Sequence, residues 1–511
     1  MIGQHWSGQE KTGYPWVPDQ GDGTFRNPII HADYSDPDVI RHGDDYWMVA
    51  SSFTCTPGLP ILHSRDLVNW TLVNHAIKNV PHPRYQDVQP GCGVWAPAIR
   101  FHDNLFWIFF PMPDEGIYVT CASDPAGEWH EPWLLQEAKG WIDPCPFWDD
   151  DGQAYLVHAY ANSRAGKKER IHIRPMTPDC TRLLGEGQEV IHTPHHAYLE
   201  GPKVHKLNGW YFILAPGGGV PQGWQVVFRS QSLFGPYEEK VVLEKGSTPI
   251  NGPHQGALVD LPNGEWWFLH FQDAGAYGRI VHLQPVEWKD NWPLMGVDYD
   301  GNGVGEPVPA WRKPTVTGPV SVSVPQTSDD FSATKLGLQW QWQANHDEGW
   351  HSLAARPGWL RLFSQPAHQD LGRTPALLMQ KFPARSFCVE TLLDLHSHHV
   401  TDRAGIAVVG GGENASVART SDGCVLTING QDIIEISILA GPVRFCVCVD
   451  DTATCVFSYA GADGTFIELP TSFQAKHGGW MGSKVGLFCL TSQAKASSGY
   501  ADFQSFIFSS H

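Results

Sequence analysis

Three carboxylates stand at equivalent places in a repeated sequence pattern. Asp36 opens DPDVIRHGDDYWMVASS, Asp143 opens DPCPFWDDDGQAYLVHAY and Glu200 opens EGPKVHKLNGWYFIL. Each stretch is typical of a short strand, a polar turn and an aromatic-rich strand, and Asn208-Gly209 is a strong hairpin signal. A pair of carboxyl groups in one pocket can hydrolyse a glycosidic bond, because one protonates the leaving oxygen while the other activates water.

The same pattern occurs twice more, and this predicts the fold. Trp95 opens WAPAIRFHDNLFWIFF and His254 opens HQGALVDLPNGEWWFLHF. The copies recur every ~45–60 residues, which is the spacing of propeller blades. Helical periodicity is nearly absent. We therefore predict an all-β chain with a five-bladed β-propeller over residues 25–315, in which the five opening residues converge at one end of the central channel.

The remaining segments differ in composition. Residues 316–327 are rich in Pro, Val and Ser, which is typical of a linker. Residues 328–511 contain short alternating strands separated by turns, which predicts a β-sandwich. Residues 1–24 precede the first copy of the pattern and form an N-terminal extension.

Composition narrows the classes of function. Aromatic residues make up 12% of the chain, with 22 Trp, and such rings fill β cores or stack on sugars. The net charge of -19 disfavours nucleic acid as a partner. No apolar run reaches membrane-spanning length. The first residues lack signal-peptide features, and the 11 scattered Cys contain no CxxC pair, so we expect a cytoplasmic protein with reduced thiols. The oligomeric state stays open, a homo-oligomer included.

Each opening residue also has a structural interpretation. Asp36 and Asp143 could start turns, Glu200 could end a solvated strand, and Trp95 and His254 could be core residues. Their shared place in the repeat favours the functional interpretation, because three acids aimed at one pocket repel one another and have little structural use. We interpret the acids of the opposite turns as structural, namely Asp44, Asp45, Asp149, Asp150 and Asp151.

Taken together, several motifs make the chain similar to a known family. In order, these motifs are NPII, SDPDVI, DDYWMVASSF, LHSRDLVNW, WAPAIRFHD, WIDPCPFWDDDG, EGPKVHKLNGWY and GRIVHLQPVEW. They resemble glycoside hydrolase family 43, in nearly the order and spacing of its β-xylosidases. The resemblance runs from about Asn27 through the C-terminal sandwich. It implies a five-bladed propeller with an inverting mechanism, followed by a concanavalin-like β-sandwich.

The resemblance also implies roles for individual residues. Asp36 resembles the general base, Asp143 the residue that raises the pKa of the acid and orients it, and Glu200 the general acid. Three further positions match substrate-contacting residues of the family, namely Phe53, Trp95 and Arg279. Physical reasoning agrees, since the acid must be protonated near neutral pH and a nearby ionised carboxylate raises its pKa.

Two residues, His254 and Trp480, each have more than one candidate role. His254 heads the fifth copy, where it could contact substrate or the base, or bind a divalent ion such as Ca²⁺ with several waters. The family's xylosidases often have a Gly-His-Gly stretch there, whereas this chain has NGPHQGALVD. Trp480, in GGWMGSKVGLFCLTS, resembles the aromatic residue that the sandwich domain sends to the rim of the active site, or it packs only the domain interface.

We therefore predict an inverting exo-glycosidase that releases β-D-xylose from the non-reducing ends of xylo-oligosaccharides. An α-L-arabinofuranosidase, or an enzyme with both activities, is the nearest alternative, because the two sugars present similarly placed hydroxyls. A non-catalytic carbohydrate-binding propeller and a retaining enzyme with a carboxylate nucleophile are the others. Retention of all three carboxylates argues against the binding propeller.

Overall fold

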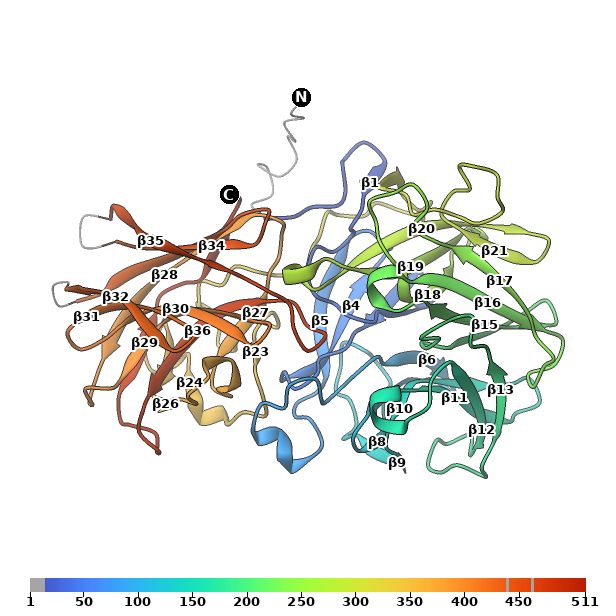
Figure 1. Ribbon diagram of the computed structural model, residues 1–511, viewed down its shortest axis with the longest axis horizontal. Coiled ribbons are helices and arrows are strands. Elements are labelled where there is room, and N and C mark those ends of the chain that lie inside the picture. Colours follow the sequence, from blue (N-terminus) through green and yellow to red (C-terminus); the bar gives the residue numbers. More distant parts are fainter. Residues whose placement is uncertain (1–13, 438–440, 461–463) are drawn as a thin grey trace.

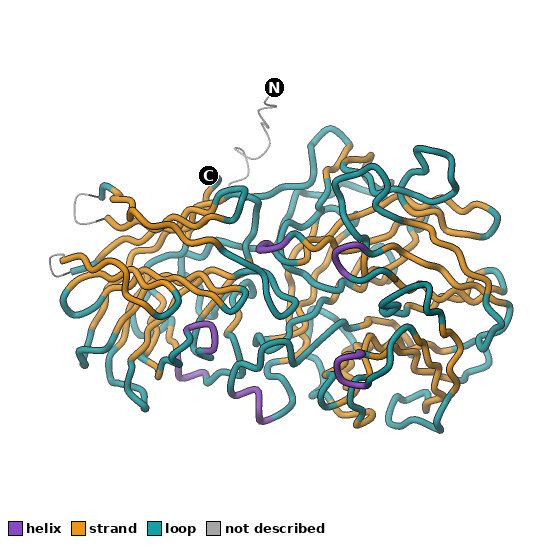
Figure 2. Tube along the Cα trace, in the orientation of Figure 1, coloured by secondary structure: helices purple, strands orange, loops and turns teal. Residues whose placement is uncertain are grey.

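Strands and loops make up nearly all of the computed structural model (Figure 2), which describes residues 14–437, 441–460 and 464–511. Residues 1–13, most of the predicted N-terminal extension, lie outside the described residues. Helical turns in the described part are few and short, and none is long and apolar enough to cross a membrane. They are η1 (Pro83–Gln86), α2 (Asn162–Ala165), η2 (Val220–Gln222), η3 (Gly275–Tyr277), η4 (Glu348–Trp350) and η5 (Leu371–Arg373).

Five four-stranded antiparallel sheets in the described residues form the blades of a propeller, beside the sandwich (Figure 1), as predicted. Along the chain the first strand of each sheet is followed by its three neighbours in order. The blades are β2 (Asp38–His42), β3 (Asp45–Val49), β4 (Gly58–Ser64), β5 (Trp70–Ile77); β6 (Ala98–His102), β7 (Leu105–Met112), β8 (Gly116–Ala122), β9 (Trp133–Glu137); β10 (Trp141–Trp148), β11 (Ala154–Tyr160), β12 (Arg170–Met176), β13 (Gln188–His192); β14 (Lys203–Leu207), β15 (Trp210–Gly217), β16 (Trp224–Ser230), β17 (Glu238–Leu243); and β18 (His254–Asp260), β19 (Trp266–Asp273), β20 (Arg279–Lys289), β21 (Trp292–Met295).

The hairpin that joins β14 to β15 shows how local sequence sets these blades. Leu207 pairs with Trp210, so the loop holds only Asn208 and Gly209, both with positive φ (52° and 80°). Two such residues form the tight turn whose twist suits a hairpin. The apolar side chains of the strands then pack between neighbouring blades. For example, Ile213 of β15 shares a core with Val157 of β11.

The ring of blades is tied together near its ends. β1 (Thr24–Arg26) pairs with β22 (Ala310–Arg312), and Ile30 exchanges backbone hydrogen bonds with Val281 of the fifth blade, at 3.3 and 3.0 Å. The start of the propeller is therefore bound to its last blade, which fixes the channel that the inner strands surround.

Two eight-stranded sheets form the C-terminal β-sandwich in the described residues, again as predicted. Their inner faces enclose one large apolar core, and β28 shows the alternation of buried and partly buried residues that such a layer requires. One sheet holds β23 (Gln341–Trp342), β26 (Gln365–Pro366), β27 (Leu378–Lys381), β29 (Arg403–Gly410), β30 (Glu413–Arg419), β31 (Gly423–Ile428), β32 (Gln431–Ser437) and β36 (Lys484–Thr491). The other holds β24 (His351–Ser352), β25 (Leu360–Phe363), β28 (Phe387–His396), β33 (Val443–Val449), β34 (Thr454–Ala460), β35 (Phe466–Gln474), β37 (Tyr500–Phe503) and β38 (Ile507–Ser509).

A disulfide joins Cys388 of β28 to Cys448 of β33. The expectation that all cysteines stay reduced is wrong for this pair. The two residues lie directly opposite each other on neighbouring strands, and that register cannot be read from spacing in the sequence. The other nine cysteines of the described residues are free.

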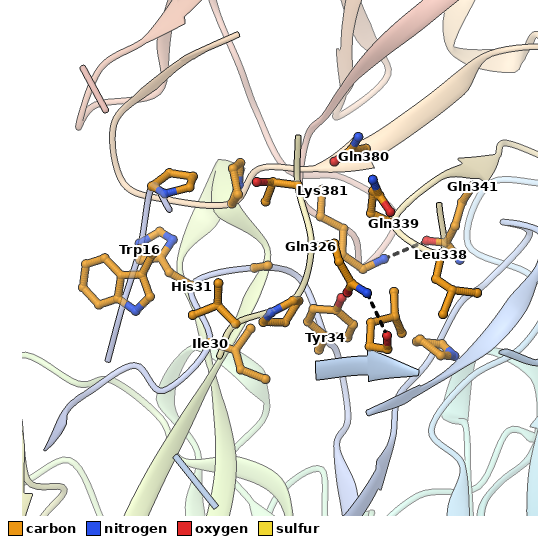
Figure 3. A pocket seen from close by; sticks show the side chains of 18 of the residues that line it. Trp16, Ile30, His31, Tyr34, Gln326, Leu338, Gln339, Gln341, Gln380 and Lys381 are labelled. Atoms are coloured by element: carbon orange, nitrogen blue, oxygen red, sulfur yellow. Dashed lines mark hydrogen bonds between the residues drawn. The ribbon is translucent and has the colours of Figure 1, made fainter. Parts of the chain in front are cut away.

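Specific contacts join the sandwich to the first blade. Thr56 forms a β-bridge with Trp342, and the Thr54 hydroxyl donates to the Gln343 carbonyl at 2.7 Å. A cavity of about 50 Å³ remains in this interface (Figure 3), where the Lys381 ammonium donates to Gln341 Oε1 at 2.9 Å. The interface fixes the sandwich beside the mouth of the channel.

Candidate active site

The three predicted carboxylates converge at one end of the channel. Asp36, Asp143 and Glu200 line one cavity of about 440 Å³, a size suited to a small ligand. All five blades and one loop of the sandwich contribute to its wall. The other predicted residues on this wall are Phe53, Trp95, Arg279 and Trp480.

Asp36 is a buried carboxylate that accepts several hydrogen bonds. The hydroxyls of Ser35 and Ser51 donate to Oδ2 at 2.6 and 2.7 Å. Arg279 Nη1 lies 2.9 Å from Oδ1 and 3.1 Å from Oδ2. A buried negative charge requires such partners, so this arrangement suits a carboxylate that stays ionised.

Asp143 reaches the cavity because its strand is irregular. The register of β10 against β11 shifts between Ile142 and Cys145, and such a bulge redirects a side chain. The Gly201 N–H donates to Asp143 Oδ2 at 2.7 Å. Burial raises the pKa of Asp143 to about 6, the charge of Asp36 adds to the rise, and the Gly201 hydrogen bond opposes it.

Glu200 lies just before β14, and its N–H donates to the Pro216 carbonyl at 3.1 Å. Burial raises the pKa of Glu200 well above its usual value, and the charges of Asp143 and Asp36 raise it further, while Arg279 lowers it. This carboxyl is therefore the one in the cavity best suited to keep a proton and donate it.

Gly201 explains why Glu200 is followed by glycine. Its φ is 63°, and a Cβ there would lie 2.8 Å from Gln255 Oε1. Any larger residue would therefore be strained and would push against the side chain beside it. Glycine thus permits the left-handed backbone from which the Gly201 N–H donates to Asp143.

Six residues of the cavity wall other than glycine have a left-handed backbone. Residues of this kind usually avoid positive φ, and each instance costs about 1–3 kcal/mol. The packing around the cavity must therefore hold them, and such strain is common at functional sites. They are Asp36 (54°), Phe53 (52°), Asp143 (54°), Tyr198 (57°), Gln255 (41°) and Trp480 (74°).

Aromatic rings form the rim. The indoles of Trp95 and Trp480 meet edge to face with centroids 6.5 Å apart, and the Arg279 guanidinium lies 5.8 Å from the Trp480 ring centroid. Trp480 is 51% exposed, which is too open for a residue that only packs an interface. It lines the cavity instead.

One buried carboxylate ties the Trp480 loop to the propeller. Asp33 accepts from the Gly482 N–H through Oδ2 and from the Arg279 N–H through Oδ1, both at 2.9 Å. The loop of the sandwich and the strand that carries Arg279 are therefore held by the same side chain.

His254 does not line the cavity. It is fully buried, its Nε2 lies 3.5 Å from Glu200 Oε1, and burial lowers its pKa to about 3, so the ring is neutral. Neither ring nitrogen hydrogen-bonds to a residue that the structure describes.

A calcium ion at His254 would need most of its ligands from water. Calcium takes six to eight oxygen ligands, whereas His254 offers one nitrogen at a time. The groups of three or more close ligand atoms among the described residues exclude His254; they are His195, His196, Glu239 and Cys388, Cys448, His511. We assign no catalytic step to a metal.

The sequence did not single out several residues of the site. Tyr198 and Gln255 line the cavity, while Ser35, Ser51 and Asp33 hold the groups around Asp36 and Arg279. A weak signal existed for Gln255, which follows His254 in the fifth copy and sits at a break in the register of β18. Nothing in the sequence pattern distinguished the serines or Asp33.

Known proteins are similar to this chain in sequence or in structure. It is 41% identical over 480 residues to a putative beta-xylosidase from Xylanibacter ruminicola, covering 94% of this chain and 88% of that protein. It is 28% identical over 409 residues to a non-reducing end alpha-L-arabinofuranosidase from Bacteroides ovatus, covering 75% of this chain and 73% of that protein. The solved structure of a mutant GH43 protein, BlXynB from Bacillus licheniformis, matches 96% of this chain and 100% of its own, with a TM-score of 0.85 at 25% identity.

Two family profiles match the two domains. The profile of the beta xylosidase C-terminal concanavalin A-like domain covers residues 328–509, which include the strands of the sandwich. The profile described as glycosyl hydrolases family 43 covers residues 25–293, which include the three carboxylates and all but the last two residues of the five blades. The chain is thus a glycoside hydrolase and belongs to glycoside hydrolase family 43.

Proposed function

We propose that this chain is an inverting exo-β-xylosidase that removes β-D-xylose from the non-reducing ends of xylo-oligosaccharides. The observation that carries the proposal is the difference between two acids in one cavity. Asp36 is held by Arg279 and two serines, as an ionised base requires, whereas the pKa of Glu200 is raised, as a proton donor requires.

In the proposed reaction Glu200 donates its proton to the glycosidic oxygen while Asp36 takes a proton from a water molecule. The water attacks the anomeric carbon on the face opposite the leaving group, so the configuration inverts. Asp143 is the positioning residue. Its carboxylate holds the Gly201 N–H next to Glu200, and its charge contributes to the raised pKa of the acid.

The walls of the cavity suit a single terminal sugar. Phe53 and Trp95 offer ring faces for the apolar side of a pyranose, and Arg279 has further donors for a hydroxyl. Trp480 narrows the mouth from the sandwich side, which favours chain ends over internal positions. The relative from Xylanibacter ruminicola, named a putative beta-xylosidase, supports xylose as the sugar.

α-L-Arabinofuranosidase activity is the second candidate. The relative from Bacteroides ovatus carries that name at 28% identity. Arabinofuranose and xylopyranose present similarly placed hydroxyls, so the same carboxylates can serve either sugar.

A panel of substrates tests the proposal. We expect nitrophenyl β-D-xylopyranoside and xylobiose to give the highest kcat/KM, nitrophenyl α-L-arabinofuranoside a lower value, and polymeric xylan little release. A reversed order of the two nitrophenyl sugars would favour the arabinofuranosidase. Binding of xylobiose without turnover of any substrate would favour the carbohydrate-binding propeller. Elemental analysis, with assays before and after chelation, tests the predicted calcium.

A further inference from the structure

A lysine of the sandwich and a cysteine of the propeller meet beside the active site. Lys484 is the first residue of β36, and Cys55 lies two positions after Phe53 of the cavity wall. The Lys484 Nζ atom is 2.7 Å from Cys55 Sγ. Both residues are buried, with 6% and 3% of their surfaces exposed.

This separation is unusual for nitrogen and sulfur. The next shortest nitrogen–sulfur hydrogen bonds among the described residues are 3.2 Å, from Arg100 to Cys145, and 3.4 Å, from the Val204 N–H to Cys145. A direct N–S bond would be shorter than the S–S bond of about 2.05 Å. A distance of 2.7 Å is therefore short for a hydrogen bond to sulfur and too long for a covalent N–S bond. It fits a nitrogen and a sulfur that are each singly bonded to one bridging atom.

The charge around Lys484 gives a second, independent reason. Lys484 makes no ion pair with a described residue, and its amine hydrogen-bonds there only to sulfur, at Cys55 and, at 3.7 Å, at Met481. Its partner across the sheet is another lysine, the partly buried Lys381, whose pKa is lowered by burial and by the charge of Lys484. Lys381 differs because it has an oxygen partner, Gln341 (Figure 3). A buried ammonium without a carboxylate is costly, and forming a neutral covalent bond removes that cost.

We propose that oxidation joins Lys484 to Cys55 through one oxygen atom, as an Nζ–O–Sγ bridge between the two domains. With hydrogen peroxide as the oxidant, two peroxide molecules are reduced and both O–O bonds break. The S–H bond and one N–H bond break, and one oxygen forms the new S–O and O–N bonds. The other three oxygens leave as three water molecules with the six remaining hydrogens. Sulfur and nitrogen each lose two electrons.

An oxidant can approach this pair from the side of Lys484. Lys484 and Met481 line a cavity of about 370 Å³, which also contacts Gly91 and Thr54 of the propeller. The bridge would fix two parts of the active-site wall, because Cys55 follows Phe53 and Lys484 follows Trp480 by four positions. Oxidation would thereby lock the Trp480 loop against the propeller.

Peptide mapping of the full-length protein tests the bridge. The wild type is analysed as isolated, after hydrogen peroxide and after dithiothreitol, with free thiols alkylated under denaturing conditions. After peroxide we expect a cross-linked pair of peptides that contains Cys55 and Lys484 and has gained one oxygen and lost two hydrogens. Dithiothreitol should return the separate peptides, with the amine, the thiol and one water restored.

Matched variants define the site. Cys55→Ser and Lys484→Arg should each abolish the cross-link, whereas Cys121→Ser, which removes another buried free thiol, should retain it. The wild-type arm decides the matter even if a variant fails to fold. Recovery of Cys55 after peroxide as an alkylatable thiol or a sulfinic acid, with Lys484 unmodified, would overturn the proposal. So would a cross-link that lacks the added oxygen.

Discussion

The two mouths of the propeller channel are built from the same five inner strands yet treat acidic residues differently. At the mouth opposite the candidate site, a cavity of about 480 Å³ is lined by residues of β2, β6, β10, β14 and β18. Acids there are matched by cations. The pairs are Asp38 with Arg100 (2.6 Å), Asp150 with Lys206 (2.8 Å) and Asp260 with Arg41 (2.7 Å).

At the site mouth the acids outnumber the cations. Within the described part of the chain, Arg279 pairs with Asp36, and neither Asp143 nor Glu200 forms an ion pair with Lys or Arg. The pKa values of Asp149 and Glu200 show the effect of this difference in pairing. Burial acts to raise the pKa of Asp149 at the opposite mouth, but hydrogen bonds from Lys206 and Tyr211 outweigh it and the pKa is lowered. For Glu200 the charge of Arg279 acts to lower the pKa but does not outweigh burial and the charges of Asp143 and Asp36, so its pKa rises.

Neither a cavity nor the presence of carboxylates in it identifies a catalytic site. Both mouths have a cavity of similar volume and several acids. The two mouths differ in how their acids are paired with cations. At the site mouth the unequal pairing leaves one acid protonated beside an ionised one. Substitutions of acids at the site mouth should therefore reduce activity, whereas those at the opposite mouth should leave it nearly unchanged.

Asp36→Asn should have the largest effect. Water activation is lost whatever the leaving group, so kcat/KM should fall by about 10⁴-fold on both xylobiose and nitrophenyl xyloside. The matched control is Asp260→Asn at the opposite mouth, which breaks an ion pair that is partly exposed and should leave kcat/KM within about twofold. Steady-state kinetics on both substrates measures this, and similar losses in the two variants would refute the distinction between the mouths.

Glu200→Gln should discriminate between leaving groups. A sugar leaving group needs a proton, so the rate on xylobiose should fall by about 10²–10⁴-fold, whereas an activated nitrophenyl group needs less help and should lose much less. The ratio of the two rates is the measurement. An equal loss on both substrates would argue that Glu200 is not the acid.

Asp143→Asn should change the pH dependence more than the maximum rate. Activity falls as the pH rises through the pKa of Glu200, because the acid loses its proton. The charge of Asp143 helps to raise that pKa, so removing it should move the alkaline limb of kcat/KM to lower pH. Asp149→Asn serves as the control and should leave the limb in place. An unmoved limb in Asp143→Asn would remove Asp143 from this role.

Trp480→Ala should have the smallest effect. Loss of one aromatic contact, worth about 1 kcal/mol, should raise KM for xylobiose about fivefold. The melting temperature should hold because the side chain is half exposed, and Trp480→Phe should restore much of the binding. Unchanged KM in Trp480→Ala would leave the ring without a role in substrate binding.

The repeat explains how much of this could be predicted from sequence. Residues at equivalent places in five hairpins must meet at one end of a propeller, so Asp36, Trp95, Asp143 and Glu200 could be brought together without any structure. The turn at Asn208 was equally predictable, because a two-residue hairpin loop is a local property.

Features that depend on long-range approach or on irregular strands were not predictable. Asp33 and Gly482 are 449 positions apart and meet only because the sandwich docks on the propeller. Gln255 lines the cavity because the register of β18 shifts there, and His254 beside it does not line the cavity. Cys388 and Cys448 depend in the same way on a strand register within the sandwich.

The stereochemistry of the first product tests the central claim most directly. If Asp36 activates water opposite a protonated Glu200, the xylose first released from nitrophenyl β-D-xylopyranoside is the α anomer. Proton NMR spectra recorded within the first turnovers, before mutarotation equilibrates the sugar, separate the two anomers. The proposed inverting mechanism predicts that the α-anomer signal appears first and the β-anomer signal grows later. Initial release of the β anomer would contradict it, because that outcome requires a carboxylate nucleophile and a covalent intermediate.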